Sequence, residues 1–274
     1  MLKLLKKICL PLFLLCPFFV VSLAVAAYAN DLSREFQNNS FSDIFITTKK
    51  ADLTVIMSTN TATSTLTWKN KNCAVDIKKL SEDVINISVE PKAQYVFLKQ
   101  ILGIPRPACK LQLMLGENKT LYASSETGDI RFFDASLEAV KVYTTQGTVE
   151  ISNYTGNLSA ETLTGEISVK NSNCNNLALK TASGQIDING NAAQANILNT
   201  SGTTKLQGNI DDLHFYSSTG NFTAHRQNIP TGKINLLARS SSGDIKIIFP
   251  KGTDLTGSNI EIKSTYGYGV LQYN

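Results

Sequence analysis

The candidates for catalysis in this 274-residue chain are three carboxylates, Glu150, Glu166 and Asp187. We expect their side chains on the outward side of neighbouring strands. Acids gathered in one groove, often with Lys or Arg beside them, are typical of enzymes that cleave polysaccharides. Here the acids alternate with Ser168 and Thr203, which favours a solvated face. We therefore predict no catalytic residue and a non-enzymatic protein, with a polysaccharide lyase or hydrolase as the alternative.

Other residue types that do chemistry are sparse. His214 and His225 are the only histidines, and no pairing of a nucleophile with a base can be argued from them. A calcium-binding solenoid needs closely spaced Asp carboxylates around glycine-rich turns. Neutral residues interrupt the acids at the corresponding positions, which are Asp129, Thr148, Glu166, Gln185, Thr203, Asn221 and Asp244. The sequence predicts neither a metal nor a cofactor.

Two long polar segments near the C-terminus offer the one cluster of cations. Residues 225–233 and 249–259 are insertions at the same place in adjacent repeats, so we expect the two loops side by side. They would bring together His225, Arg226, Lys233 and Lys251 as a cationic lip at the edge of the stack. This cationic lip would suit an anionic ligand, for example a polysaccharide or a lipid headgroup. The alternative is a pair of solvated loops.

A repeat indexed on glycine positions these residues. Successive glycines are 18 or 19 residues apart, and the last two intervals are 23 and 24: Gly128, Gly147, Gly165, Gly184, Gly202, Gly220, Gly243 and Gly267. Apolar residues recur seven and five positions before each glycine, and two and four positions after the first seven, with Thr204 as the polar exception. A Ser, Thr or Asn stands three positions before every glycine.

One arrangement explains these columns. If each repeat is one coil of a parallel β-solenoid, equivalent residues stack about 4.8 Å apart and the apolar columns merge into one core. The Ser/Thr/Asn column is then expected to form an internal ladder of side-chain hydrogen bonds. The glycines suit a turn that needs positive φ or close backbone approach. An antiparallel sandwich would also give alternating strands, but it has no reason to keep one register through seven copies.

The first half is also predicted to be all-β. Residues 41–109 contain short strands with period-two alternation, as at Val75 and Ile77, and residues 110–274 hold the repeats. The apolar segment 95–107 is either a cap over the first end of the solenoid or a loop that touches a partner or membrane. Outward Tyr143, Leu198 and Leu237 could likewise form a contact surface.

The N-terminus indicates export. Residues 1–29 have three lysines, a long apolar run and an Ala-x-Ala ending, as in a cleaved signal peptide, although the run is long enough to serve as an uncleaved anchor. Residues 30–40 form a polar lead-in. Cleavage leaves 23 Lys and Arg against 22 Asp and Glu, a net charge of +1, which does not favour nucleic-acid binding. We expect the periplasm, cell envelope or secretion, and no transmembrane segment after cleavage.

The cysteines fit an oxidising compartment. Cys9 and Cys16 lie in the leader, which leaves Cys73, Cys109 and Cys174, so at most one internal bridge can form. We favour Cys73 with Cys109, because both precede the repeats. Three buried, inert thiols are the alternative.

The repeat motifs identify a family. SETGDIRF, TASGQIDI and SSSGDIKIIFPKGTDLTGSNIEIKSTYGYG resemble the bacterial putative adhesin family, a domain of unknown function with Ser-Gly-Asp-[Ile/Val] repeats. The resemblance covers residues 110–274 well and the N-terminal strands loosely. It implies a right-handed, β-helical or roll-like fold with about 18–19 residues per coil in this chain, an envelope-associated or exported scaffold, and no established catalytic residues. The partner would be a surface ligand such as a glycan or an envelope component.

Overall fold

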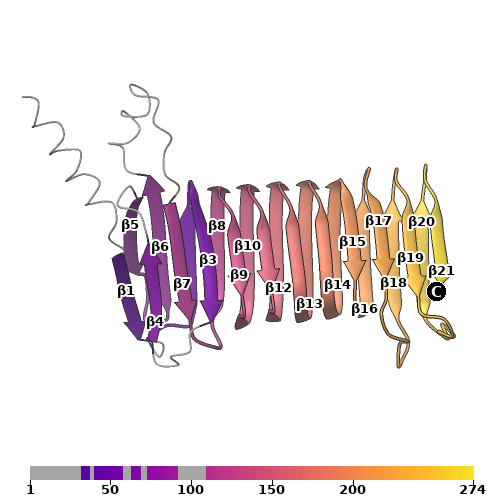
Figure 1. Ribbon diagram of the computed structural model, residues 1–274, viewed down its shortest axis with the longest axis horizontal. Coiled ribbons are helices and arrows are strands. Elements are labelled where there is room, and N and C mark those ends of the chain that lie inside the picture. The colour runs from indigo at the N-terminus through magenta and orange to yellow at the C-terminus, as the bar shows by residue number, and fades with distance from the viewer. Residues whose placement is uncertain (1–31, 38–39, 58–62, 69–72, 92–108) are drawn as a thin grey trace, which may run out of the picture.

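The computed structural model describes residues 32–37, 40–57, 63–68, 73–91 and 109–274, whose elements are 21 strands (Figure 1). In chain order they are β1 (Leu32–Gln37), β2 (Asp43–Thr48), β3 (Ala51–Met57), β4 (Thr63–Trp68), β5 (Cys73–Lys79), β6 (Val84–Pro91), β7 (Cys109–Leu115), β8 (Thr120–Thr127), β9 (Ile130–Phe133), β10 (Ser136–Gln146), β11 (Val149–Ser152), β12 (Thr155–Thr164), β13 (Ile167–Ser183), β14 (Ile186–Ser201), β15 (Thr203–Gln207), β16 (Ile210–Ser217), β17 (Asn221–His225), β18 (Asn235–Ser240), β19 (Ile245–Phe249), β20 (Asn259–Ser264) and β21 (Gly269–Tyr273).

The repeats form two parallel stacks of strands. One stack runs through β8, β10, β12, the second parts of β13 and β14, then β16, β18 and β20. The other runs through β9, β11, the first parts of β13 and β14, then β15, β17, β19 and β21. Figure 1 shows the strands side by side along the length of the molecule. The prediction of an all-β, largely parallel, β-solenoid-like fold is confirmed.

The predicted apolar columns lie inside the stacks. Val149 is paired in register with Ile130 and Ile167, and Val142 with Ala123 and Ala160. All six of these side chains are buried. Because each coil exposes its apolar edge to the next, the core is continuous along the array.

The single polar residue in the apolar columns has a specific partner. Thr204 is fully buried, and its Oγ1 accepts a hydrogen bond of 3.0 Å from Asn199 Nδ2. Asn199 is also the only Asn in the Ser/Thr/Asn column, and it belongs to the same coil. The polar exception at Thr204 therefore has a hydrogen-bond partner inside its own coil, which matters because a buried hydroxyl without a partner is costly.

The predicted ladder of side-chain hydrogen bonds is wrong for the central coils. Within the described part of the chain, the buried Oγ1 atoms of Thr144, Thr162 and Thr181 have no hydrogen-bond partner. Strand spacing explains this, because side chains stacked about 4.8 Å apart exceed hydrogen-bond distance. Near the C-terminus, the column bonds to the glycine turns instead. Ser217 Oγ accepts from the Gly220 amide at 2.7 Å, and Ser264 Oγ donates to the Gly243 carbonyl at 2.7 Å.

A third inward column escaped the sequence analysis. Cys174 pairs with Ala192, and Ala192 with Ile210, in a short ladder between the two stacks. All three are buried. The backbones of adjacent coils also approach each other closely beside this column, because a Cβ on Gly208 would lie 1.8 Å from the carbonyl oxygen of Gly190.

The N-terminal strands continue the same stacks. β2 lies between β6 and β8, and β3 between β7 and β9, all in parallel. β5 and β4 then pair antiparallel with β6 and β7, and β1 pairs antiparallel with β4. Residues 32–37, which the sequence analysis assigned to a polar lead-in, therefore form an edge strand. The leader 1–29 and the apolar segment 95–107 lie outside the described residues.

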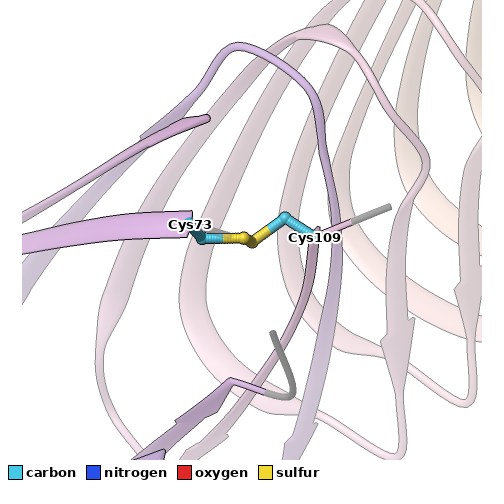
Figure 2. Close-up of a disulfide and its surroundings, with 2 residues drawn as sticks. All are labelled: Cys73 and Cys109. Carbon is cyan, nitrogen blue, oxygen red and sulfur yellow. A yellow bond between two sulfur atoms is a disulfide. The ribbon is translucent and has the colours of Figure 1, made fainter. Parts of the chain in front are cut away.

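A disulfide joins two strands at this end. Cys73 at the start of β5 and Cys109 at the start of β7 are bonded, with their Cα atoms 6.1 Å apart (Figure 2). This is the pair favoured from the sequence. β5 and β7 border different stacks, so the bond ties the two stacks together where the strands become antiparallel.

Candidate functional site

A groove crosses the outward face of β13, β14, β15 and β17. Its volume is about 580 Å³, and its polar lining is Glu166, Ser168, Lys170, Asp187, Asn189, Lys205, Gln207, Thr223 and His225. These side chains alternate with the buried columns, so the parallel register brings them together from four coils. Two carboxylates face two lysines, which makes the groove mixed in charge.

The three acids singled out from the sequence divide between two places. Glu166 and Asp187 line the groove, whereas Glu150 lies beside it in an ion-pair chain. Lys170 Nζ is 3.0 Å from one Glu150 oxygen, and Arg131 Nε is 3.7 Å from the other. Asp187 accepts a hydrogen bond of 2.5 Å from Gln185 Nε2. Glu150 and Asp187 are thus partnered with neighbours on the same face.

The expected solvated face is wrong at one position. Ser168 is paired with Glu150 on one side and Asp187 on the other, and only 5% of it is exposed. Longer side chains in the adjacent coils stand over this short one. The sequence shows the alternation of residues, but the depth of a hollow depends on side chains in three consecutive coils.

Within the described ranges, no group of three or more His, Cys, Asp and Glu side chains is placed to hold a metal ion. The same residues contain no helix that is long and apolar enough to span a bilayer.

The predicted cationic lip is only partly assembled. The two loops do meet, since the Ser258 hydroxyl accepts a hydrogen bond of 3.2 Å from the Ile234 amide, and Lys233 packs against Gly257. His225 instead lines the groove, and its Nε2 is 3.1 Å from Asn274 Nδ2. Lys251 is exposed.

Arg226 is engaged inside the protein. Its guanidinium donates to the carbonyl of Ile210 at 2.6 Å, to Asp211 Oδ1 at 2.7 Å and to the carbonyl of Asn228 at 3.1 Å. Only 10% of its side chain is exposed. These contacts hold the start of the 225–233 loop against β16, so Arg226 has a structural role there.

Arg226→Lys is expected to destabilise the fold, because an ammonium cannot make the three divergent contacts of the guanidinium. We expect a loss of about 1–3 kcal/mol in the free energy of unfolding, measured by denaturant titration. Lys251→Gln is the matched control on the exposed neighbouring loop and should leave stability unchanged. Equal stability of wild type and Arg226→Lys would contradict this role.

A second hollow lies on the outward face of the other stack. It has a volume of about 290 Å³ and is bordered by Phe45, Tyr122, Lys141 and Tyr143, with Thr47, Ser124, Ser159 and Glu161 between and around them. Tyr143 was recognised from the sequence as an outward aromatic residue. Phe45 was missed as a neighbour of Tyr143 and Tyr122, because β2 lies outside the glycine-indexed repeat. Alignment of β2 with β8 on their hydroxyl residues, Thr48 with Ser125, could have found them.

The one free cysteine of the described residues is sealed inside the core. Burial raises the pKa of the Cys174 thiol to about 11, and it also raises the pKa of nearby Tyr154. The Tyr154 hydroxyl donates to the carbonyl of Asn157 at 2.8 Å. Both groups serve packing.

Cys174 is expected to resist alkylation in the native protein at pH 8, since the reactive thiolate is suppressed and enclosed. It should react fully once the chain is unfolded in denaturant. Mass spectrometry of the peptide that contains Cys174 measures this directly. Rapid native labelling would contradict the inward position of this column.

Several solved structures are similar to this chain. A solved putative adhesin from Bacteroides fragilis is 13% identical, with 89% of this chain and 97% of that chain covered at a TM-score of 0.49. A putative lipid binding protein from Parabacteroides distasonis is 17% identical, with coverages of 89% and 97% and a TM-score of 0.47. A putative adhesin from the same species is 9% identical, with coverages of 90% and 98% and a TM-score of 0.45.

No curated protein matches the chain. The family model described as Toastrack DUF4097 matches residues 41–273. This match starts just before β2 and ends in β21, so it takes in the N-terminal strands as well as the repeats. The Ser-Gly-Asp-[Ile/Val] form of the repeat stays a prediction. Because the model spans most of the sequence, the chain belongs to the Toastrack DUF4097 family.

Proposed function

We propose that this protein is a non-enzymatic, adhesin-like scaffold of the bacterial envelope or surface. We also propose that its stack is a right-handed β-solenoid with about 18–19 residues per coil. The observation that carries the functional proposal is the pairing of outward charges along the stack. Arg131, Glu150 and Lys170 form one such chain, and Arg239 with Glu261 forms a bidentate pair at 2.8 Å for each bond.

Paired charges on a regular framework favour surface contact over catalysis. A general acid or base must be able to exchange a proton with a substrate. Side chains that neutralise one another across coils instead give a mixed, low-charge face. Such a face can contact a partner without repelling it, and the close backbone packing of the coils keeps the face rigid.

The proposed compartment follows from the leader and the cysteines. An N-terminal segment of the signal-peptide type would deliver the chain to the periplasm, envelope or exterior, where a disulfide persists. Cell fractionation together with N-terminal sequencing tests this proposal. A chain recovered in the cytoplasm with residues 1–29 intact would overturn it.

The ligand class is tested with the protein as the cell exports and processes it. Saturable binding to a panel of glycans and envelope fractions, without conversion of the ligand, supports the scaffold. A variant with residues 225–233 replaced by a short Gly/Ser turn tests the cationic lip, and Lys233→Gln with Lys251→Gln tests its two exposed lysines. Unchanged binding by both variants would remove the lip from the proposal.

The groove keeps the carbohydrate-active enzyme as a second candidate. Glu166 and Asp187 share one groove with Lys170, Lys205 and His225. Two carboxyl groups in a single groove are the catalytic pair that most glycoside hydrolases use.

A further inference from the structure

The hollow beside Tyr143 is open because of the order of side chains along one outward column. Thr47 on β2, Ser124 on β8 and Tyr143 on β10 are in register in three consecutive coils. The two small residues leave free the space on the β2 side of the Tyr143 ring. Tyr143 is accordingly 44% exposed, although its strand lies within the stack.

A rigid wall flanks this space. The Phe45 and Tyr122 rings are stacked, with centroids 4.4 Å apart and an interplanar angle of 2°. Lys141 Nζ lies 5.2 Å from the centroid of Tyr122. Tyr122 therefore stacks against Phe45 and also contacts the Lys141 cation. These contacts hold the two rings in place before any ligand binds.

The remaining surroundings are polar. Ser124 Oγ is 3.5 Å from Thr47 Oγ1, a weak contact that leaves hydroxyl capacity for another partner. Glu161 stands on the far side of Tyr143 in the same column and binds Lys180 at 2.6 Å. The Tyr143 ring thus has the Thr47 and Ser124 hydroxyls on one side and the Glu161–Lys180 ion pair on the other.

This combination selects the chemistry of the occupant. A sugar ring has an apolar C–H face that can pack on an aromatic side chain and hydroxyls at its edge that bond to Ser, Thr and carboxylate groups. The volume lies just below the usual range for small-molecule pockets, which matches one ring or two and not a folded partner. A peptide that adds a strand would need a sheet edge, whereas this hollow lies on a sheet face.

We propose that the hollow of Phe45, Thr47, Tyr122, Ser124 and Tyr143 is a subsite for one pyranose ring of a neutral glycan, stacked on Tyr143. The inference deepens the proposed scaffold function by naming the ligand class. It requires no charge on the sugar, because Lys141 is engaged with Tyr122 and Glu161 with Lys180.

The test uses the full chain, expressed with its leader and purified as the cell processes it. The probes are neutral oligosaccharides of glucose and of N-acetylglucosamine, with binding measured by calorimetry and saturation-transfer NMR. Tyr143→Ala should weaken binding about tenfold or more, whereas Tyr143→Phe should stay within about threefold because the ring remains. Ser124→Phe fills the space with a ring in register with Tyr143 and should abolish binding.

Tyr266→Ala removes an 85% exposed tyrosine far along the stack and is the matched control, expected to bind as wild type does. Circular dichroism checks that each variant is folded. Equal binding by wild type and Tyr143→Ala, or by Ser124→Phe, would place the sugar elsewhere and overturn the subsite. Absence of binding to every neutral sugar would overturn it too. Retention on envelope fractions in that case would leave the scaffold function standing, and retention on lipid vesicles alone would assign the surface to membrane.

Discussion

Gly184→Ala is expected to disrupt the stack, because its new methyl group would collide with the coil before it. An ideal Cβ at this position lies 1.9 Å from the carbonyl oxygen of Gly165 and 2.9 Å from its carbonyl carbon. The obstacle is backbone that is itself hydrogen-bonded into the next turn, with the Gly165 amide donating to Ser183. Relief would require separation of two coils, so we expect a loss of about 3 kcal/mol or more in the free energy of unfolding.

Gly232→Ala is the control for this experiment. Gly232 lies in the 225–233 loop, and a Cβ there would meet no atom within 4 Å. The same substitution should be neutral or stabilise the protein by up to about 1 kcal/mol, through a smaller entropy of the unfolded chain. Denaturant titration of both variants measures the difference. Equal stability of the two variants would show that the glycine column does not hold neighbouring coils in contact.

Ile186→Asp is expected to unfold the array. Ile186 is fully buried at the start of β14, between Ile167 and Thr204 in the stack. A carboxylate there would have no cationic partner and would be removed from water, at a cost of more than about 4 kcal/mol. Because coils stabilise each other only through neighbours, the loss should appear as a drop in the whole transition and in soluble yield.

Asn196→Asp on the same strand is the matched control. Asn196 is exposed, so an isosteric carboxylate there should change stability by less than about 0.5 kcal/mol. Gln185, just before the start of β14, is a poorer control. Its amide donates to Asp187, and Gln185→Asp would place two carboxylates together. A folded Ile186→Asp with the stability of Asn196→Asp would mean that the inward register is wrong.

Periodic residues made the fold predictable from the sequence. Each column of the repeat is one position of a strand seen many times, so the inward residues of β8 to β20 emerge from spacing alone. The third column did not emerge. Cys174, Ala192 and Ile210 differ in size and polarity, and the residue shortly before them changes from Asn171 in β13, at a φ of 49°, to Gly190 in β14.

The surface hollows were less predictable, for a physical reason. Their shape depends on which side chains are short in adjacent coils, as Ser168 is in the groove and Ser124 beside Tyr143. The Tyr143 hollow also needs residues 77 positions apart in the sequence, because β2 pairs with β8 although β6 and β7 lie between them in the chain, β6 on the other side of β2 and β7 beside β3. The Arg226 contacts likewise depend on the path of one irregular loop.

Product analysis during ligand binding tests the scaffold function most directly. Wild type and a Glu166→Gln, Asp187→Asn double variant are incubated with envelope polysaccharides, and bound ligand is measured alongside new reducing ends and unsaturated uronate. We predict saturable binding and no products from either protein. Products formed by wild type and lost in the double variant would contradict the scaffold function and establish the groove as an active site.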